Sequence, residues 1–560
     1  MGVLRFFKHV MKKYKQQAIT SILKKGERYI HLGYKNPNPD VLLIDCNAVF
    51  HPACRSVFDP STESILRPSQ LTPEQKKQKA FREVCKLLEK IIQVGQPQKV
   101  VYLAIDGVAG CCKQSQQRKR RFKTARDSIE NPGSWDSSVL TVGTSFMTEL
   151  SEHMRLHFST TPLYNLQGHQ LRVIFNSQNI PGEGEHKLVR FVENDRQYRS
   201  YCIYSPDADL IMLGMLLPKS YVTILRENIY QDQAADYFLV NIYHLKKEFL
   251  TEMQRLSVMM LIEPSQQLEA MNHFSYLDIV LFFFMLGNDF LPHVSCIDIL
   301  SDGIDVLLQT YVMSVLKENH GPLVYSSGKL AYQFNMKSLL SLLDRLQDDE
   351  PGLLVQKSNK LRPPIPDTVL EQSMNDDKCS MDFMSYRSAY YIRNFGSDSD
   401  ETIQEVCNEY LKGLIFVIQY YAKAIPTFEW FYPFHYSPLF YDLYMFVEKL
   451  VSEGRQLEYI FEFKPPLTQI EALASVLHPN SFDSIPHPQV REYMKTRALI
   501  DSSFPETFEV DLEGKMQEYE GIILLPMIPY ETIRTILKKY KLRDPNDQIV
   551  DLVDRNRIRR

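Results

Sequence analysis

The sequence predicts an α/β protein with a mostly parallel sheet flanked by helices, followed by a large, mainly helical second region. The first half of the chain alternates short apolar runs with helical patterns, which is typical of parallel strands joined by crossover helices. From about residue 240 onward the pattern is helical. A chain of 560 residues is also long enough for two domains, each with its own core.

The predicted elements follow one another along the chain. The amphipathic opening, residues 1–14, predicts a helix. Five apolar runs predict buried strands, at residues 41–47, 99–107, 171–177, 201–209 and 221–227. Helical patterns at 80–94 and 186–195 lie between them. Residues 351–400 are rich in Pro, Ser and Asp, which predicts a polar loop or mobile linker. An aromatic-rich tract follows at 427–446.

Composition narrows the class of protein. Hydrophobic residues make up 44% and charged residues 24% of the chain, and the net charge is −4. These values are ordinary for a globular protein and give no whole-chain reason to expect a polyanionic partner. The nine cysteines form no C-x-x-C pair, which favours a reducing compartment. No run approaches the roughly 20 apolar residues of a membrane span. We expect a cytoplasmic protein, with the nucleus or a virion as alternatives.

Seven acids follow apolar runs or lie beside glycines. They are Asp45, Asp106, Glu183, Glu185, Asp207, Asp209 and Asp289. In an open α/β sheet, ligands bind beyond the carboxyl ends of the strands, so most of these acids are expected to converge there. Any single one could be a helix cap or a turn residue. As a set they would repel one another, and two Mg²⁺ or Mn²⁺ ions about 4 Å apart would neutralise them and support phosphodiester hydrolysis.

A basic segment begins seven residues after Asp106. Its side chains Lys113, Gln117, Arg120 and Arg121 are spaced i, i+4, i+7 and i+8, which places them on one face of a helix. Arg118 and Lys119 point elsewhere. Two guanidinium groups, an ammonium and an amide on one face can bind a terminal phosphate. A solvated basic face or a nuclear-import run is the alternative. The proximity to a candidate metal ligand favours a phosphate pocket.

The chain resembles the XRN family of 5′-to-3′ exoribonucleases. The resemblance rests on blocks in the same order: MGVLRFFKHVMKKY, LLIDCNAVFH, AIDGVAGCCKQSQQRKRRF, IPGEGEHK, SPDADLIMLG, LGNDFLPH, FEWFYPFHYSP and FEVDLEGKMQEYEGIILLPMIP. It implies a nuclease domain over 1–228 with a core like those of PIN and flap nucleases. A helical domain over 229–560 would complete the active site. This chain would be a compact member, without the long C-terminal modules of the large relatives.

The resemblance also implies an activity and residue roles. The expected activity is processive degradation of 5′-monophosphorylated single-stranded RNA to 5′-mononucleotides, with single-stranded DNA as a further substrate and no membrane partner. The seven acids would hold two metal ions. Lys113, Gln117, Arg120 and Arg121 would bind the 5′-phosphate. His51 would stack on the first base together with Trp430, for which Phe428 is the substitute.

Two other functions remain open. A flap-endonuclease-like, structure-specific DNA nuclease shares the carboxylate core, but the sequence after Asp289 contains no helix-hairpin-helix with a Gly-rich turn. A catalytically inactive RNA-binding scaffold would be expected to have lost acids, and all seven are present. The sequence leaves the preferred metal ion and the protein partners undetermined.

Overall fold

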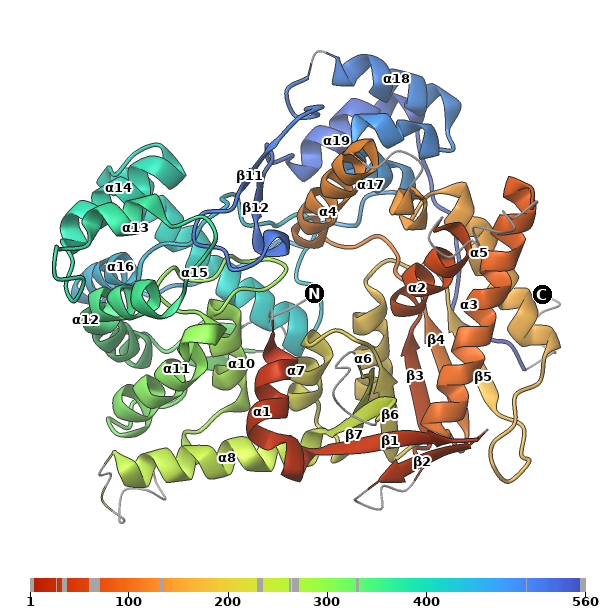
Figure 1. Ribbon diagram of the computed structural model, residues 1–560, viewed down its shortest axis with the longest axis horizontal. Helices are drawn as coiled ribbons and strands as arrows, with labels where there is room; N and C mark the ends of the chain where they lie inside the picture. The colour runs from red at the N-terminus through yellow and green to blue at the C-terminus, as the bar shows by residue number, and fades with distance from the viewer. Residues whose placement is uncertain are drawn as a thin grey trace. The chain divides into compact units, whose positions relative to one another are not determined.

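The computed structural model describes residues 5–26, 28–32, 38–59, 71–130, 135–228, 235–260, 263, 271–328, 332–499 and 501–553 (Figure 1). The chain divides into two compact units, each built from separate stretches of sequence. The sheet unit comprises Tyr14–Leu245, Lys464–Thr507 and Leu525–Arg560. The helical unit comprises Met1–Lys13, Lys246–Phe463 and Phe508–Leu524. The domain boundary expected at residue 228 stays a prediction.

Nine strands of the described chain form the main sheet, in the order β13-β5-β4-β3-β6-β7-β8-β1-β2. Its five central strands are parallel. They are β3 (Val41–Asp45), β4 (Val100–Ala104), β5 (Arg172–Asn176), β6 (Ser200–Tyr204) and β7 (Tyr221–Glu227). The five predicted strands and the mostly parallel sheet are therefore confirmed. Buried parallel strands are apolar on both faces, which is why these runs were readable.

Four further strands extend the two edges of the sheet. β8 (Tyr237–Asn241), β1 (Ile19–Lys25) and β2 (Arg28–Leu32) continue it antiparallel beyond β7. β13 (Val550–Asp551) pairs antiparallel with β5 at the opposite edge. These strands were not predicted. β1, β2 and β13 are partly polar and lack a continuous apolar run, whereas β8 is apolar and buried from Tyr237 to Val240 and was missed.

Helices cover both faces of the parallel strands. On one face, α2 (Asn47–Phe58), α3 (Pro73–Gly95) and α5 (Ser145–Thr160) pack on a core that includes Leu42 and Ile44 of β3. On the other lie α6 (Gly184–Asn194) and α7 (Asp209–Leu216). There the ring of Tyr102 from β4 contacts that of Phe191 from α6, at 4.7 Å between centroids. Alternate residues of each strand thus serve the two faces.

Segments late in the sequence complete the sheet unit. The basic helix α4 (Cys111–Glu130) packs against α17 (Gln469–Val476), and α17 packs against α19 (Tyr530–Leu537). The contact between α4 and α17 includes a buried hydrogen bond, in which Ser475 Oγ donates to Gln114 Oε1 at 3.1 Å. The position of α4 is therefore fixed by residues more than three hundred positions away.

The helical unit is built mainly of helices. They include α10 (Tyr276–Met285), α11 (Gly303–Tyr311), α12 (Met336–Lys360), α13 (Thr368–Ser373), α14 (Phe383–Phe395), α15 (Asp400–Ala422) and α16 (Phe440–Ser452). The predicted N-terminal helix is confirmed as α1 (Phe6–Ala18), and α8 (Ile242–Met259) is also present. The ring of Phe6 packs on Phe283 of α10, with centroids 4.5 Å apart. A short antiparallel pair, β11 (Glu509–Asp511) and β12 (Ile522–Leu524), joins this unit.

The prediction of a polar loop or linker over residues 351–400 is wrong. The end of α12, all of α13 and α14 and the start of α15 occupy this stretch. The Asp residues that suggested a loop are helix caps: Asp367 accepts from the backbone N–H of Leu370, and Asp382 accepts from that of Ser385. Asp and Ser favour caps as strongly as they favour loops. No described helix is long and apolar enough to cross a bilayer.

Candidate active site

Acidic side chains cluster at the carboxyl ends of adjacent strands β4, β3 and β6. Asp45 is the last residue of β3, and Asp106 lies two residues beyond β4. Asp207 follows β6, and Asp209 begins α7. Glu183 and Glu185 lie at the start of α6. The prediction that strand ends bring these six acids together is supported by the sheet order.

Two small polar residues connect the strand ends. The backbone N–H of Asn47 donates to Asp45 Oδ1 at 3.2 Å, and Asn47 Oδ1 accepts from the backbone N–H of Asp106 at 2.9 Å. Ser205 Oγ lies 3.5 Å from Asp45 Oδ2 and accepts from the backbone N–H of Asp207 at 3.2 Å. These bonds hold the ends of three strands in register around the acids.

Gly184 gives the tightest measure of how closely the acids converge. Its backbone N–H donates to Asp106 Oδ1 at 2.6 Å. A Cβ atom on this residue would lie 3.0 Å from Asp45 Oδ1 and 3.1 Å from Asp106 Oδ1. Both carboxylates therefore face the first turn of α6, and no larger residue fits there without moving them. The partial positive charge of a helix N-terminus favours anionic groups at this point.

Mutual repulsion among the acids shows in their pKa values. Burial and the neighbouring charges of Asp106 and Asp207 raise the pKa of Asp45 well above its usual range. Burial, and then Glu183, likewise raise the pKa of both Asp106 and Glu185, with Asp209 also acting on Glu185. Like charges at close range and loss of hydration both oppose ionisation. The cluster would be stabilised by added positive charge.

Two lysines supply part of that charge. Lys113 Nζ lies 2.8 Å from Glu183 Oε2. Lys187 Nζ donates to the carbonyl oxygens of Ile105 and Ser177, at 2.7 and 2.8 Å, and so ties together the ends of β4 and β5. Burial lowers the pKa of Lys187 to about 7, an effect that Asp106 opposes. Two lysines cannot neutralise six carboxylates.

The acids fit a divalent metal ion. Ligand atoms of Glu183, Glu185 and His186 lie within 4.8 Å of one another. Glu185 Oε1 is buried and has no hydrogen-bond partner among the described residues. A buried carboxylate oxygen without a donor is costly unless a cation binds it. Oxygen-rich sites of this kind suit Mg²⁺ or Mn²⁺.

His186 and Lys187 are site residues that the sequence reasoning missed. Both directly follow Glu185 in the block IPGEGEHK. A signal was present, because a histidine and a lysine beside two paired glutamates are a recognisable combination of metal ligand and counter-charge.

The predicted phosphate-binding side chains lie on one helix. Lys113, Gln117, Arg120 and Arg121 all belong to α4, which confirms the helix but leaves their role a prediction. Arg120 is exposed, whereas Arg121 is buried. Burial and the adjacent Arg120 lower the pKa of Arg121 to about 10, while Asp136 and Asp106 oppose this. Arg121 is therefore a buried cation within electrostatic range of the acid cluster.

His51 lies near the same arginines. It belongs to α2 and is half-buried. Burial, followed by Arg121, Arg120 and Arg55, lowers the pKa of His51 to about 3. The imidazole is thus neutral at physiological pH. The role of this ring in stacking on a terminal base stays a prediction.

Arg118 points away from the phosphate face, as expected, and has a structural position. It is buried against the rings of Phe122 and Phe504, 4.5 and 5.6 Å from their centroids, and donates to the carbonyl oxygen of Ser503. Lys119 is half-buried, and burial lowers its pKa to about 8. Arg118 thus attaches the segment around Ser503 to α4.

Three predicted site residues belong to the helical unit. Asp289 is half-buried in the loop after α10. Trp430 is buried, and the centroid of its ring lies 4.3 Å from that of Phe416. Phe428 is also buried, with its ring centroid 6.3 Å from that of Phe463. The roles of Asp289 in metal binding and of Trp430 or Phe428 in stacking stay predictions.

Comparison with known proteins identifies the same family in both halves of the chain. Residues 1–228 match the family model described as the XRN 5′-3′ exonuclease N-terminus, and residues 276–361 and 367–544 match the Xrn1 helical domain. The chain is 25% identical to 5′-3′ exoribonuclease 2 of Candida albicans, over 98% of this chain and 73% of that protein.

Two longer relatives match over smaller shares of their length. 5′-3′ exoribonuclease 1 of Saccharomyces cerevisiae is 23% identical, over 96% of this chain and 43% of that protein. 5′-3′ exoribonuclease 1 of Homo sapiens is 23% identical, over 94% of this chain and 33% of that protein. The chain thus spans less than half the length of these two relatives.

Proposed function

Because the chain belongs to the XRN family of 5′-to-3′ exoribonucleases, we propose that it degrades 5′-monophosphorylated single-stranded RNA processively to 5′-mononucleotides. The observation that carries this proposal is the cluster of acids around Gly184, in which burial and neighbouring carboxylates raise the pKa of Asp45, Asp106 and Glu185. A cluster of this kind is unfavourable without bound cations and is suited to metal-assisted hydrolysis. Single-stranded DNA is a proposed secondary substrate.

The acids would hold two divalent ions, Mg²⁺ or Mn²⁺. The proposed ligands are Asp45, Asp106, Glu183, Glu185, Asp207, Asp209 and Asp289. Bound ions would supply a Lewis acid that lowers the pKa of water and stabilises the leaving 3′-oxygen. The backbone N–H groups of Gly184 and Asn47 and the hydroxyl of Ser205 orient the carboxylates, and Lys113 balances the charge of Glu183.

The helix α4 would define the 5′ end. Lys113, Gln117, Arg120 and Arg121 would bind the terminal monophosphate by charge-assisted hydrogen bonds. The buried guanidinium of Arg121 supports this role, because an anionic group would offset its lost hydration. A 5′-hydroxyl end would leave these cations unpaired, and a cap or triphosphate would exceed the space for one phosphate.

The neutral ring of His51 would stack on the first base, with Trp430 on its other side and Phe428 as the substitute. Stacking reads no base identity, so degradation would tolerate any sequence. We propose a reducing, cytoplasmic location, which is supported by the fact that all nine cysteines are free thiols.

The test compares initial rates on matched RNAs that carry a 5′-phosphate, a 5′-hydroxyl or a cap, with and without Mg²⁺. We expect sequential release of 5′-mononucleotides from the phosphorylated RNA alone, and only with the metal ion. Equal rates on RNAs with phosphate and hydroxyl ends would refute the proposal that α4 forms a pocket for the 5′-phosphate. Internal cleavage of flap-structured DNA in preference to RNA would favour a structure-specific nuclease instead.

A further inference from the structure

The helical unit contains a cavity of about 220 Å³ that is formed entirely by its own residues. Its lining comes from the loop after α10, the end of α12 and the segment after it, α13, α14, the tract around Tyr436, and the hairpin of β11 and β12. Apolar surface is contributed by Pro292, Leu361 and Ile522. A concave site with apolar walls and a few polar groups is typical of a small-molecule pocket.

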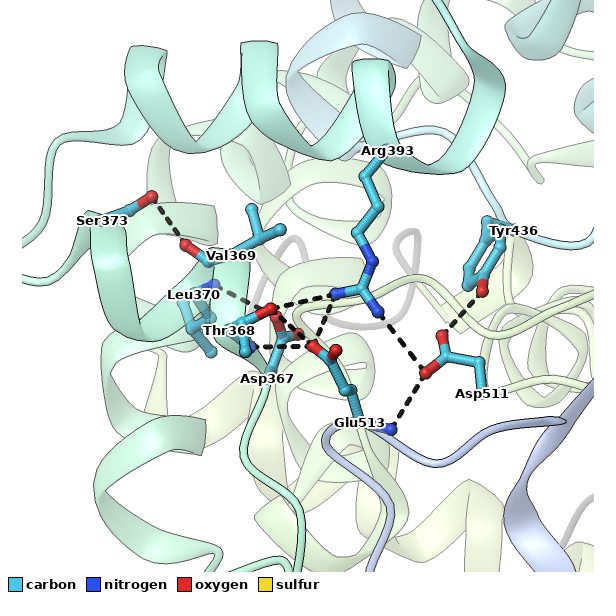
Figure 2. A network of polar contacts seen from close by, with 9 residues as sticks. All are labelled: Asp367, Thr368, Val369, Leu370, Ser373, Arg393, Tyr436, Asp511 and Glu513. Carbon is cyan, nitrogen blue, oxygen red and sulfur yellow. Dashed lines mark hydrogen bonds and ion pairs between the residues drawn. The ribbon is translucent and has the colours of Figure 1, made fainter. Parts of the chain in front are cut away.

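One wall of this cavity is an ion-pair network (Figure 2). Arg393 contacts Glu513 Oε2 at 2.6 Å and Asp511 Oδ1 at 3.5 Å. The hydroxyl of Tyr436 donates to Asp511 at 2.7 Å, and both the N–H and the hydroxyl of Thr368 donate to Glu513. The two carboxylates are thus occupied by partners within the wall, and the charge of Arg393 is balanced there.

Four basic side chains line the cavity outside this network: His293, Lys357, Arg362 and Lys515. Arg362 donates to the carbonyl oxygens of Ser358 and Leu361. Lys357 Nζ donates to the carbonyl oxygen of Ser295 at 2.6 Å, which uses one of its three donors. Among the described residues, neither lysine forms an ion pair with a carboxylate within 4 Å. Asp367 and Glu371 also line the cavity, but no carboxylate in the described part of the chain lies close enough to form an ion pair with either ammonium group, so each lysine can bind an anion that enters the cavity.

The titration behaviour of these groups agrees with that placement. Burial, and then Lys357, lower the pKa of Lys515 to about 8, although Asp511, Asp298 and Asp367 oppose this. Lys515 remains mostly protonated at neutral pH. Burial and both lysines lower the pKa of His293 well below its usual range, so its ring is neutral and can donate or accept one hydrogen bond. An anion between these groups would relieve the repulsion between the lysines.

We propose that this cavity is a binding site for a small molecule with a phosphate monoester group, with the phosphate held by Lys357, Lys515 and His293. Lysine ammonium groups are common phosphate ligands, and they act as point charges that need no fixed geometry. The apolar walls would contact the remainder of a ligand the size of a nucleoside monophosphate or smaller. The site lies outside the acid cluster and its function does not depend on nuclease activity.

Isothermal titration calorimetry on the full chain tests this site, with inorganic phosphate, adenosine 5′-monophosphate and adenosine as probes. The variants are Lys515→Met and Lys357→Met, which remove one charge each with little change of shape. Lys449→Met, an exposed lysine of the same unit that does not line the cavity, is the matched control. Arg120→Ala/Arg121→Ala separates this site from the proposed 5′-phosphate pocket.

We expect Lys515→Met and Lys357→Met each to weaken one class of adenosine 5′-monophosphate binding by about tenfold or more, while Lys449→Met binds as wild type. The Arg120→Ala/Arg121→Ala variant should retain that class, and adenosine should bind weakly or not at all. Wild-type binding in both lysine variants would overturn the proposal. So would loss of all binding in the arginine variant, or equal binding of adenosine. Melting curves show that each variant is folded, and the two lysine variants give independent results.

Discussion

Buried carboxylates occur in both units, but their surroundings differ. In the helical unit, Asp278 accepts hydrogen bonds from the hydroxyl of Tyr311 and the backbone N–H groups of Leu323 and Val324, at 2.8, 2.9 and 3.2 Å. It has its own donors and no neighbouring acid raises its pKa. In the sheet unit, the acids around Gly184 face one another and share few donors. Burial alone therefore does not mark a catalytic acid; like-charged neighbours and missing donors do.

Glu350 extends the comparison. This fully buried side chain of α12 accepts from the backbone N–H groups of Phe440 and Tyr441 at the start of α16, at 3.0 and 2.9 Å. It caps one helix from another, which is a structural task. The acids of the sheet unit accept few hydrogen bonds from helix ends and repel one another. Their arrangement is therefore unfavourable for folding, and the binding of metal ions would explain it.

The largest expected effect is on catalysis. Asp209→Ala should reduce RNA hydrolysis by about 10³-fold or more, because it removes a ligand of the proposed metal ions. Its melting temperature should equal or exceed that of the wild type in EDTA, since a repulsive charge is lost. Asp278→Asn is the matched control, with a lower melting temperature and an unchanged rate per folded molecule. Comparable rates for Asp209→Ala and the wild type would refute a catalytic role of the cluster.

A smaller effect is expected at the phosphate face of α4. Arg120→Ala/Arg121→Ala should lower the rate on 5′-phosphorylated RNA by about 10- to 100-fold, towards the rate on 5′-hydroxyl RNA. Arg118→Ala should instead lower the melting temperature, because Arg118 packs on Phe122 and Phe504, and keep the preference between the two ends. The two substrates are assayed side by side. An unchanged preference in the double variant would mean that these arginines form only a solvated face.

The structural acids predict a dependence of stability on pH. Burial raises the pKa of Asp278 to about 7, above its value in the unfolded chain, so the folded state binds more protons between about pH 4 and 7. This contribution to stability is complete at low pH and is lost as pH rises through 7. Asp278→Asn should cost about 1–3 kcal/mol at pH 5 and less at pH 7.5. Urea unfolding at both pH values measures the difference; an equal cost would contradict the assignment.

The smallest effect is expected for base stacking. His51→Ala should weaken single-strand binding by about 1–3 kcal/mol with little change in melting temperature, and it should shorten processive runs. Trp430→Ala should weaken binding as well, but unlike His51→Ala it should lower the melting temperature, because the ring of Trp430 packs on Phe416. Filter binding and product-length analysis measure both. Full processivity in His51→Ala would exclude the ring from the RNA path.

The sheet was predictable from the sequence because its central strands are buried on both faces and therefore continuously apolar, as in VLLID at Val41–Asp45. Asp45, Asp106, Asp207 and Asp209 were predictable because they lie at or just beyond the ends of those runs. The helices over residues 351–400 were not, since Asp367 and Asp382 carry the same local signal as caps and as loop residues. Equally, no local pattern shows that α17 returns to pack on α4, because that contact joins residues far apart in the sequence.

The raised pKa values of the acids could not be read from the sequence either. They depend on the close approach of Asp45 and Asp106 over Gly184, which only the folded sheet creates. Likewise, Lys187 gains its role by reaching the carbonyl oxygens of Ile105 and Ser177. Sequence spacing places these residues near one edge of the sheet; packing determines which of them contact.

The most direct measurement follows mononucleotide release from a 5′-phosphorylated single-stranded RNA by the wild-type chain and by Asp209→Ala, in Mg²⁺ and in EDTA. We expect stepwise release from the 5′ end by the wild type in Mg²⁺, and none in EDTA or by the variant under either condition. Release that persists in EDTA, or in Asp209→Ala with Mg²⁺, would contradict the claim that the acid cluster of the sheet unit is a metal-dependent catalytic site.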